Sequence, residues 1–393
     1  MNNYYHLIKT VSGKIIPLIV LFLGINGLFI LKYIGRTSYS PILLLLLYCA
    51  FSCFVIFTFF HYAQKLNKNC TNILIGLLTL TIILGISLLN YFINPLDIMV
   101  DRWSAIHNVI HNLFIGQYPY SAHTHLNGYG SPFPIWQLFH IPFYLLGNIA
   151  FAMIFSVLLL IYTLVRFTKN KKSSLLYLLL LAISPAFWYE VAVRSDLFYN
   201  FLLVLMAILF FQKKNYKIDK NPILLGAICG LFLSTRLSIV IPFFIYFFQD
   251  FTLSRLKNKT GFIFMIVFCF VVSFLPLVFW DFDTLFFFKY NPFVLQSRQG
   301  SLLEVIIIGS LSVLLALTWK MDFLKFNAYT AYTTTALVLV TFLHKMINTN
   351  FANHLFSPTY DITYFNMALP FLIFSIAYSF SDITEKSKLQ PYK

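Results

Sequence analysis

Long apolar runs dominate the sequence, and they predict helices that cross a membrane. A helix needs about 20 mostly apolar residues to cross the hydrocarbon core of a bilayer. Runs near that length cover residues 14–31, 41–61, 72–93, 149–166, 174–188, 197–212, 262–280, 301–319, 327–343 and 360–380. The pattern therefore predicts an all-α fold in which residues 1–393 form a single integral membrane domain.

Two further apolar stretches are unlike ordinary spans. Residues 132–147 contain three prolines, and sixteen residues at 1.5 Å rise reach about 24 Å, short of the ~30 Å hydrocarbon core. Residues 221–250 form two apolar halves that are broken at Arg236. We expect a short re-entrant or juxtamembrane helix in the first stretch and a hairpin that returns to its starting side in the second. Counted with both halves of the hairpin, the polytopic bundle would have about 12 transmembrane segments.

The composition excludes a soluble globular protein. Hydrophobic residues make up 59% of the chain and charged residues only 10%, whereas soluble proteins carry about 25% charged residues. The 46 Phe and 24 Tyr residues suit lipid-facing helices with aromatic belts at the membrane interfaces. A formal charge of +15 would suggest nucleic acid as the partner of a soluble domain, but in a membrane protein basic residues first report orientation. The lipid bilayer is therefore an expected partner and nucleic acid is not.

The basic residues predict the side of the membrane on which each loop lies. With the N-terminus in the cytoplasm, most of the 28 Lys and Arg residues fall in cytoplasmic segments, as the positive-inside rule requires. If residues 132–147 crossed the membrane fully, the basic loops 166–172 and 213–220 would move outside. We therefore expect both termini in the cytoplasm and three outer segments, at residues 94–131, 281–300 and 344–359. The five cysteines show no pairing or metal-ligand spacing, so we expect neither a disulfide nor a zinc site.

The first large outer segment, residues 94–131, carries the most informative polar pattern. Asp97 and Asp101 are four residues apart, as are His107 and His111, so each pair would share one face of a helix. Apolar residues recur at spacings of three and four, at Leu96, Val100, Trp103, Ile106, Ile110, Leu113 and Phe114. This spacing predicts a helix on the membrane surface that ends at Gly116, with Asp97 at its N-terminal cap.

Two aromatic and proline-rich motifs follow this helix, Gly116-Gln-Tyr-Pro-Tyr120 and Tyr129-Gly-Ser-Pro-Phe-Pro134. Together with Asp101, they resemble the first outer loop of the GT-C fold membrane glycosyltransferases, which use polyprenyl-phosphate sugars as donors. The group with the most similar pattern is the family 87 mannosyltransferases. The resemblance is best over residues 97–150 and otherwise rests on helix number and topology. It continues weakly at three later positions, Ser184-Pro185, Arg194 and Asp196.

The resemblance implies transfer of a single sugar, mannose or another hexose, with inversion on the outer face of a bacterial plasma membrane. The donor would be a polyprenyl-phosphate sugar, and the acceptor would be linked to a lipid or to the cell envelope. Asp101 matches the acidic residue of the family, which is taken to act as general base, so the outer segment would carry the active site. A positioned carboxylate can accept the proton of an attacking sugar hydroxyl, which supports the role on chemical grounds as well.

The leaving group determines which other residues the reaction needs. It departs as a phosphate monoester, whose second pKa is about 6, so it needs positive charge rather than a proton. Basic residues that could bind the donor phosphate are Arg102, Arg194, Arg236, Lys289 and Arg298. Residues expected to contact the substrates are Tyr118, Tyr120, His123, His125, Tyr129 and Asp196. We expect no cofactor and no metal site; a divalent cation would have to use the helical spacing of His107 and His111.

Structural roles stay open for the same residues. Asp101 could cap the helix or pair with Arg102, and Arg236 could extend to the interface instead of contacting a lipid phosphate. Three charged residues further on could simply pair with one another: Glu190, Arg194 and Asp196.

Two other functions are also open. One is a multi-helix transporter or flippase of envelope precursors, a class that tends to have repeated halves with paired broken helices. Only one broken pair is visible in this sequence. The other is an envelope polysaccharide polymerase or ligase, which would be expected to keep its large outer loop late in the chain.

Overall fold

The computed structural model describes residues 2–168, 170–297, 300–318, 322–347, 350–356 and 360–388. The described residues are predominantly helical. The described residues form no β-strand, and their only extended pairing is an isolated bridge between His123 and Tyr129. The predicted all-α fold class is confirmed.

Contacts between residues divide the chain into two compact units. Unit 1 comprises Met1–Ser87, Leu158–Glu190 and Asp322–Lys393, and unit 2 comprises Leu88–Val157 and Val191–Met321. Three of the four boundaries fall inside helices: α3 (Lys68–Phe92), α6 (Phe151–Phe167) and α8 (Pro185–Ala192). Each of these helices therefore contributes residues to both units.

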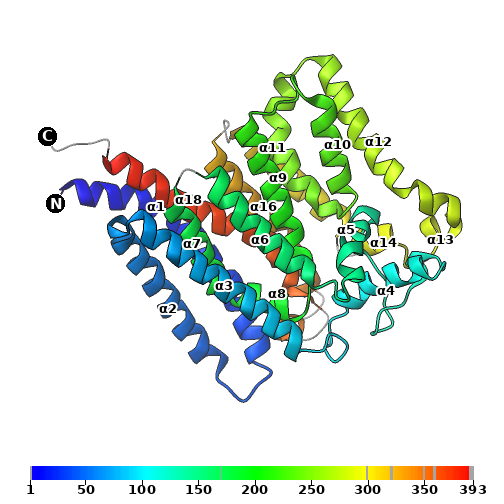
Figure 1. Cartoon of the computed structure of the whole chain (residues 1–393), viewed down its shortest axis with the longest axis horizontal. Helices are drawn as coiled ribbons and strands as arrows, with labels where there is room; N and C mark the ends of the chain where they lie inside the picture. The colour runs from blue at the N-terminus through cyan, green and yellow to red at the C-terminus, as the bar shows by residue number, and fades with distance from the viewer. Residues whose placement is uncertain are drawn as a thin grey trace. The chain divides into compact units, whose positions relative to one another are not determined.

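Unit 1 is built around helix α18 (Leu369–Lys388), in which every residue from Leu369 to Ala377 is buried. A helix that is buried on all sides belongs in the middle of a bundle. Helix α18 packs against α1 (Asn2–Ile34), α7 (Lys171–Ala182) and α16 (Phe323–Met346), as Figure 1 shows, and α1 packs against α2 (Pro41–Tyr62). The shorter elements of this unit are η1 (Ala63–Lys65), α17 (Phe351–Phe356) and η4 (Ile362–Met367).

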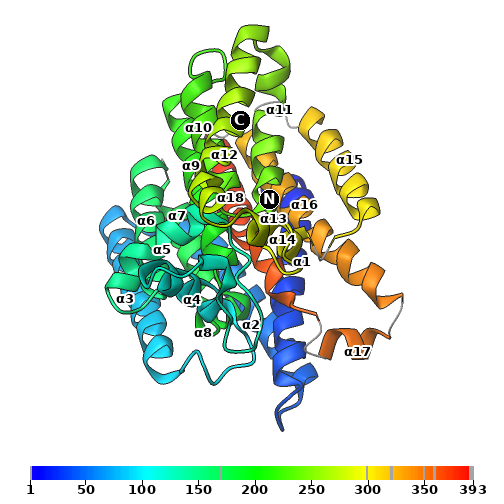
Figure 2. The same ribbon diagram turned by 90° about the vertical axis from the view of Figure 1, so that its right-hand side faces the viewer.

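Two helix pairs form much of unit 2 (Figures 1 and 2). Helix α10 (Pro222–Leu233) packs along α12 (Leu256–Trp280), and α11 (Val240–Leu253) packs along α15 (Leu302–Thr318). A Cβ atom at Gly226 or Gly230 would lie 2.5 Å from a backbone carbonyl oxygen of α12, so these glycines permit the close approach of α10. The other elements are α4 (Arg102–Phe114), η2 (Pro119–Ser121), α5 (Pro134–Leu145), α9 (Leu197–Lys214), η3 (Leu237–Ile239), α13 (Phe282–Phe286) and α14 (Pro292–Ser297).

Several helices are long and apolar enough to cross a membrane. Six candidate spans occur among the described residues: Ile15–Ile34, Pro41–Tyr62, Lys68–Phe92, Leu197–Lys214, Leu256–Trp280 and Ile362–Ser379. The bent pair α7 and α8 adds a seventh if it is counted as one span. Shorter apolar helices cover Phe151–Phe167, Pro222–Leu233, Leu237–Leu253 and Leu302–Thr318. These helices fit an integral, multi-pass membrane protein, as the apolar runs predict.

The run predicted at residues 174–188 is not one straight helix. Helix α7 ends at Ala182 and α8 begins at Pro185, with a bend of 63° between them. Proline lacks a backbone N–H and disfavours helical geometry in the residue before it, here Ser184. The Ser184 hydroxyl donates to Asn26 Oδ1 at 2.6 Å, and the Ala186 N–H donates to the same oxygen at 3.0 Å. A side chain of α1 therefore stabilises the broken helix end.

The hairpin predicted at residues 221–250 is confirmed. The Ile218 N–H, before α10, donates to Asp250 Oδ2 in α11 at 2.7 Å. The Arg255 N–H, after α11, donates to Asp219 Oδ1 at 2.9 Å. The chain therefore leaves and returns at the same end, and the break between the two halves includes Arg236.

Helix α5, in the stretch predicted to be a short helix, has 12 residues and is about 18 Å long.

The surface helix begins later than the spacing predicts. It starts at Arg102, and the residues before it form a turn in which Asn94 Oδ1 accepts the Leu96 N–H at 3.2 Å. The turn preference of Asn and Pro here outweighs the apolar periodicity. Asp97 therefore does not cap the helix. Asp101 occupies the cap position, but its side chain accepts no hydrogen bond from the first turn of α4. The predicted C-terminal end of the helix is confirmed, because α4 stops at Phe114 and Gly116, just beyond it, has a φ of 74°.

Candidate functional site

The carboxylate of Asp101 lies at the N-terminus of α4, where a short loop holds one of its oxygens. Thr124, which is buried, donates from its hydroxyl to Asp101 Oδ2 at 2.9 Å. The Thr124 hydroxyl accepts the Gly128 N–H at 2.9 Å, and the Thr124 N–H donates to the Gly128 carbonyl at 2.8 Å. Asp101 itself is half-buried. The loop thus fixes a carboxylate that retains access to solvent.

His125 anchors this loop to α4. Its Nε2–H donates to the Ile98 carbonyl at 3.0 Å, because a carbonyl oxygen only accepts. In the neutral ring Nδ1 then accepts from the Ser104 hydroxyl, at 2.7 Å. Both ring nitrogens of His125 are therefore occupied by contacts within the protein, and its predicted substrate contact stays a prediction.

His123, Tyr129 and Lys289 meet at the surface of unit 2. The Tyr129 hydroxyl lies 3.3 Å from His123 Nε2, and the Tyr129 ring stacks on Tyr290 with centroids 5.3 Å apart. The ammonium of Lys289, which is exposed, lies 5.3 Å from the centroid of the Tyr290 ring. The structure therefore brings together two residues predicted to contact substrate and one predicted to bind phosphate, from two segments that are far apart in the sequence.

Tyr118 and Tyr120, which are predicted to contact substrate, lie in the core of the structure. Tyr120 is 2% exposed, and its hydroxyl donates to the Pro132 carbonyl at 2.7 Å. Tyr118 is 9% exposed and meets Trp280 edge to face. Both tyrosines pack in a cluster with Phe133, Phe274, Leu277 and Leu285. The Pro-Tyr motif therefore fixes the loop instead of reaching into a site.

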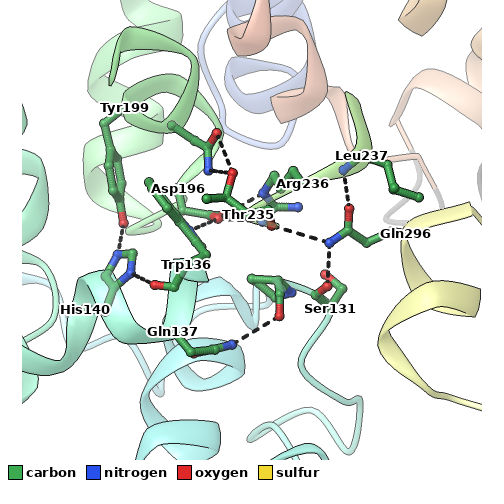
Figure 3. Close-up of polar contacts among 12 residues, drawn as sticks. Ser131, Trp136, Gln137, His140, Asp196, Tyr199, Thr235, Arg236, Leu237 and Gln296 are labelled. Carbon is green, nitrogen blue, oxygen red and sulfur yellow. Dashed lines mark hydrogen bonds and ion pairs between the residues drawn. The ribbon is translucent and has the colours of Figure 1, made fainter. Parts of the chain in front are cut away.

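Asp196 and Arg236 form a buried ion pair, shown in Figure 3. Arg236 Nη2 donates to both carboxylate oxygens at 2.6 Å, and Nε donates to Oδ2 at 3.0 Å. The indole N–H of Trp136 donates to the same Oδ2 at 2.6 Å. Burial on its own raises the pKa of Asp196, but the charges of Arg236 and Arg102 outweigh it and hold the pKa below its usual value. Asp196 is therefore a carboxylate.

This pairing bears on the predicted roles of both residues, which stay predictions. Arg236 is 4% exposed and does not extend to an interface, and its charge is matched by Asp196 instead of a lipid phosphate. Asp196 is 1% exposed, and three N–H groups donate to its two oxygens. The pair positions the chain segments around it.

A second pair of polar side chains, His140 and Tyr199, is hydrogen-bonded to the backbone of Trp136 through His140 (Figure 3). His140 Nδ1–H donates to the Trp136 carbonyl at 2.7 Å, so Nε2 accepts from the Tyr199 hydroxyl at 2.6 Å. His140 is fully buried in α5, which lies outside the candidate spans. Burial lowers its pKa to about 4, so the ring is neutral at pH 7.

The break after α10 is bonded to the start of α5. The Thr235 carbonyl accepts the Phe133 N–H and the Ser234 carbonyl accepts the Ile135 N–H, both at 3.1 Å. Gln296 of α14 joins them, since its amide donates to the Ser131 carbonyl at 2.8 Å (Figure 3). The N-terminal amides of α5 and the C-terminal carbonyls of α10, which their own helices leave unpaired, satisfy each other.

Arg194 is 7% exposed in the turn between α8 and α9. Its Nε donates to Asn90 Oδ1 at 3.1 Å, and Nη2 donates to the carbonyls of Asn90 and Ile93 at 2.8 and 2.7 Å. Its Nη1 is buried without a partner. The three charged residues that could have paired have other partners in the structure, since Glu190 accepts from Asn366 at 2.6 Å and Asp196 binds Arg236.

The remaining predicted cations are Arg102 and Arg298. Arg102 begins α4 beside Asp101, and its charge acts on Asp196. Arg298 lies outside the described residues. The rings of His107 and His111 are stacked with centroids 6.4 Å apart, and burial lowers the pKa of His107. In the part of the chain that the structure describes, His, Cys, Asp and Glu form no group of three or more that could hold a metal ion.

Several contributing residues carry no signal in the sequence. Thr124 and Ser104 act through hydrogen bonds of their side-chain hydroxyls, and Gln296 bridges segments that are far apart in the chain. Trp136 is the one that could have been anticipated, because a buried indole N–H usually has an acceptor and Asp196 is the nearby carboxylate. Comparison with known family models, curated proteins and solved structures found no match for this chain.

Proposed function

We propose that the protein is a membrane glycosyltransferase that moves a single hexose, such as mannose, from a polyprenyl phosphate to an acceptor linked to a lipid or to the cell envelope. The observation that supports it most is the geometry at Asp101. A half-exposed carboxylate has one oxygen fixed by the buried Thr124, directly beside the cation Arg102. A general base needs this combination of a fixed position and an accessible lone pair.

The reaction follows from this arrangement. The acceptor hydroxyl gives its proton to Asp101 while its oxygen forms a bond to the anomeric carbon. The bond from that carbon to the phosphate oxygen breaks on the opposite face, and the electron pair leaves with polyprenyl phosphate, so the anomeric configuration inverts. Arg102 and Lys289 supply positive charge toward the departing phosphate. The buried pair of Asp196 and Arg236 acts by holding the surrounding segments in place.

The proposed topology has about 12 transmembrane segments in a GT-C arrangement, with α5 as a short helix that does not cross. Residues 94–131 then lie outside, and both termini lie in the cytoplasm. The return of the 221–250 hairpin to its starting end supports this count, because it keeps the basic loops 213–220 and 254–259 on one side.

A transporter or lipid flippase is the second candidate, and one observation favours it. Two apolar stretches are interrupted: α7 and α8 are bent by 63°, and α10 and α11 are separated by a break at residues 234–239. Interrupted helices are typical of transporter binding sites. The polar groups at both breaks, however, have hydrogen-bond partners within the protein. Asn26 binds the break between α7 and α8, and the start of α5 binds the break after α10, which favours a structural role for both breaks.

The test is incubation of the purified protein with a panel of polyprenyl-phosphate sugars and acceptor lipids, scoring release of polyprenyl phosphate and the anomeric configuration of the product. We expect turnover with one donor, and Asp101→Asn should reduce kcat by about 10²–10⁴-fold. Asparagine can still accept the hydrogen bond from Thr124, so the loop should stay in place.

Asp97→Asn is the matched control, because Asp97 is an exposed carboxylate of the same segment. It should leave turnover within about twofold of the native rate. Normal turnover by Asp101→Asn would rule out the assigned base. Energy-dependent movement of a lipid across proteoliposomes, with no sugar transfer to any acceptor, would favour the transporter.

A further inference from the structure

Seven basic residues gather at one end of unit 2, in the two segments that flank the 221–250 hairpin. We call them the basic patch: Lys213, Lys214, Lys217, Lys220, Arg255, Lys257 and Lys259. The same two segments contain two acidic residues, Asp219 and Asp250, so seven positive and two negative charges leave a net charge of +5. A surface with this balance attracts anions.

Hydrogen bonds of the two acidic residues hold the segments together. Asp219 Oδ1 accepts the Arg255 N–H at 2.9 Å and the side-chain amide of Asn258 at 3.1 Å. Asp250 Oδ2 accepts the Ile218 N–H at 2.7 Å. Both carboxylates therefore bind donors of the main chain or of a neutral amide, and they bring the basic side chains of the two segments to one place.

The positive charge of the patch has little compensation within the protein. Six of the seven basic side chains, all except Lys259, make no hydrogen bond and no ion pair within the described residues. Lys259 donates to the Thr252 carbonyl at 3.0 Å. Lys217 and Arg255 act on the two carboxylates through their charges, without an ion-pair contact. An external anion would therefore meet unpaired cations here.

The patch lies where two candidate membrane spans end. The span Leu197–Lys214 finishes with Lys213 and Lys214, and the span Leu256–Trp280 has Lys257 in its first turn. A helix that crosses a bilayer has its ends at the depth of the lipid headgroups, and long basic side chains at those ends extend toward the phosphates. The position of the patch therefore points to a lipid headgroup as its anion.

Exposed apolar side chains lie among these charges. Leu253 is 85% exposed, Leu256 is 76% exposed and Ile223 is 53% exposed, and each is within three positions of a basic residue of the patch. A surface that combines apolar and basic side chains suits a bilayer, in which acyl chains cover the apolar groups and phosphates meet the cations. A soluble polyanion would leave the leucines in water.

We propose that the basic patch binds the headgroup of an anionic phospholipid in the adjacent leaflet, with the acyl chains of the lipid against Leu253 and Leu256. A zwitterionic phospholipid also has a phosphate, but its own ammonium group neutralises that charge, so the anionic lipid is preferred. The proposed topology makes this leaflet the cytoplasmic one. The inference does not depend on sugar transfer, because no residue of the patch is assigned to that reaction.

Lipid titrations of the purified full-length protein in a neutral detergent test the site, with the unfolding temperature as the measure of binding. The probes are phosphatidylglycerol, phosphatidylcholine with the same acyl chains, and inorganic polyphosphate as a soluble polyanion. We expect phosphatidylglycerol to bind at least about tenfold more tightly than phosphatidylcholine. Raising the salt from about 0.1 M to about 1 M should weaken this preference, because the screening length becomes shorter.

The triple variant Lys213→Gln, Lys214→Gln and Lys257→Gln should reduce the preference to about twofold or less. It should still fold, because none of these three side chains has a hydrogen bond or ion pair in the described part of the chain. Replacing the same three lysines with arginine preserves the charge and should preserve the preference.

The matched control removes three positive charges from exposed residues of unit 1, in the variant Lys65→Gln, Lys68→Gln and Arg166→Gln. It should keep the preference of the native protein. A loss as large as that of the patch variant would show that net charge is responsible, and would overturn the site. Equal binding of the two phospholipids by the native protein would overturn it as well.

A double variant tests the lipid assignment separately. Leu253→Ser together with Leu256→Ser removes exposed apolar groups and leaves the charges in place. It should weaken binding of phosphatidylglycerol without changing the binding of polyphosphate. Unchanged lipid binding in this variant, or polyphosphate that binds the native protein more tightly than phosphatidylglycerol, would overturn the assignment to a lipid.

Discussion

Arg236 contacts both carboxylate oxygens of Asp196, at N–O distances of 2.6 to 3.0 Å, although the two residues are 40 positions apart in the chain. Both are almost fully buried, and the charge of each is matched mainly by the other. A buried ion pair costs desolvation, so removing one partner is far worse than removing both.

We therefore expect Arg236→Met alone to lower the free energy of unfolding by about 3–5 kcal/mol, since it leaves Asp196 charged and buried. The double variant Asp196→Leu, Arg236→Met should be clearly more stable than that single variant, although the Trp136 N–H then lacks its acceptor. Thermal unfolding in detergent, followed by tryptophan fluorescence, compares the variants. If the loss of stability in the double variant equals the sum of the losses in the two single variants, the two charges are not coupled.

The glycines of the loop beside Asp101 should respond differently to alanine. A Cβ at Gly128 would lie 2.8 Å from Asp101 Oδ2, the end of a side chain that can move, so Gly128→Ala should keep the fold and displace the carboxylate. A Cβ at Gly130 would lie 2.7 Å from the backbone oxygen of Ala105, which cannot easily move, so Gly130→Ala should lower the unfolding temperature. We expect Gly128→Ala to reduce turnover by about tenfold or more at near-native stability.

Gly309→Ala is the control for both substitutions, because nothing lies within 4 Å of its added Cβ. It should be neutral or slightly stabilising, as alanine is a better helix former than glycine. A Gly128→Ala variant with native turnover would show that the position of Asp101 does not matter for the reaction.

Acid should destabilise the protein through His140. Burial lowers the pKa of this histidine from 6.5 to about 4, so between these values the unfolded chain binds a proton that the folded chain does not. Stability therefore falls as the pH drops from about 6.5 to 4, by about 3 kcal/mol in total, and this contribution is fully present above pH 6.5. His140→Gln should flatten that part of the profile of unfolding temperature against pH. An unchanged slope in His140→Gln would assign the effect to another group.

The orientation of the loops can be tested by cysteine labelling in intact cells. Ser121 lies in the segment that is proposed to be outside, and Lys257 lies just beyond the open end of the 221–250 hairpin; both residues are exposed. A membrane-impermeant thiol reagent should label Ser121→Cys from outside and Lys257→Cys only after permeabilisation. The native protein, with its five cysteines, gives the background. Labelling of Lys257→Cys in intact cells would reverse the proposed topology.

The fold class and the hairpin were predictable because they depend on properties that add up along the chain. Apolar length predicts helices, and the basic residues on both sides of residues 221–250, together with Arg236 inside it, indicate a stretch that turns back. The start of the surface helix was predicted wrongly. There, periodicity competed with the local turn at Asn94, and a turn depends on a few specific hydrogen bonds.

The partners within the site were predictable only in part. A charge such as Arg236 in an apolar stretch indicates that some partner exists. Which carboxylate it binds depends on how α9, α10 and α5 meet, and that packing is not encoded in any one segment. The burial of Tyr118 and Tyr120 was unpredictable for the same reason. A Pro-Tyr motif has the same sequence whether its tyrosine ring contacts a ligand or packs in a core.

The joint between α10 and α5 has a mechanical consequence. Two backbone hydrogen bonds, from Phe133 and Ile135 to Thr235 and Ser234, join segments about a hundred positions apart end to end. Separating the two segments would leave two N–H groups and two carbonyl groups of the main chain without hydrogen-bond partners. The hairpin and the short helix should therefore move together as one rigid body. Any gate that admits a substrate must then hinge elsewhere.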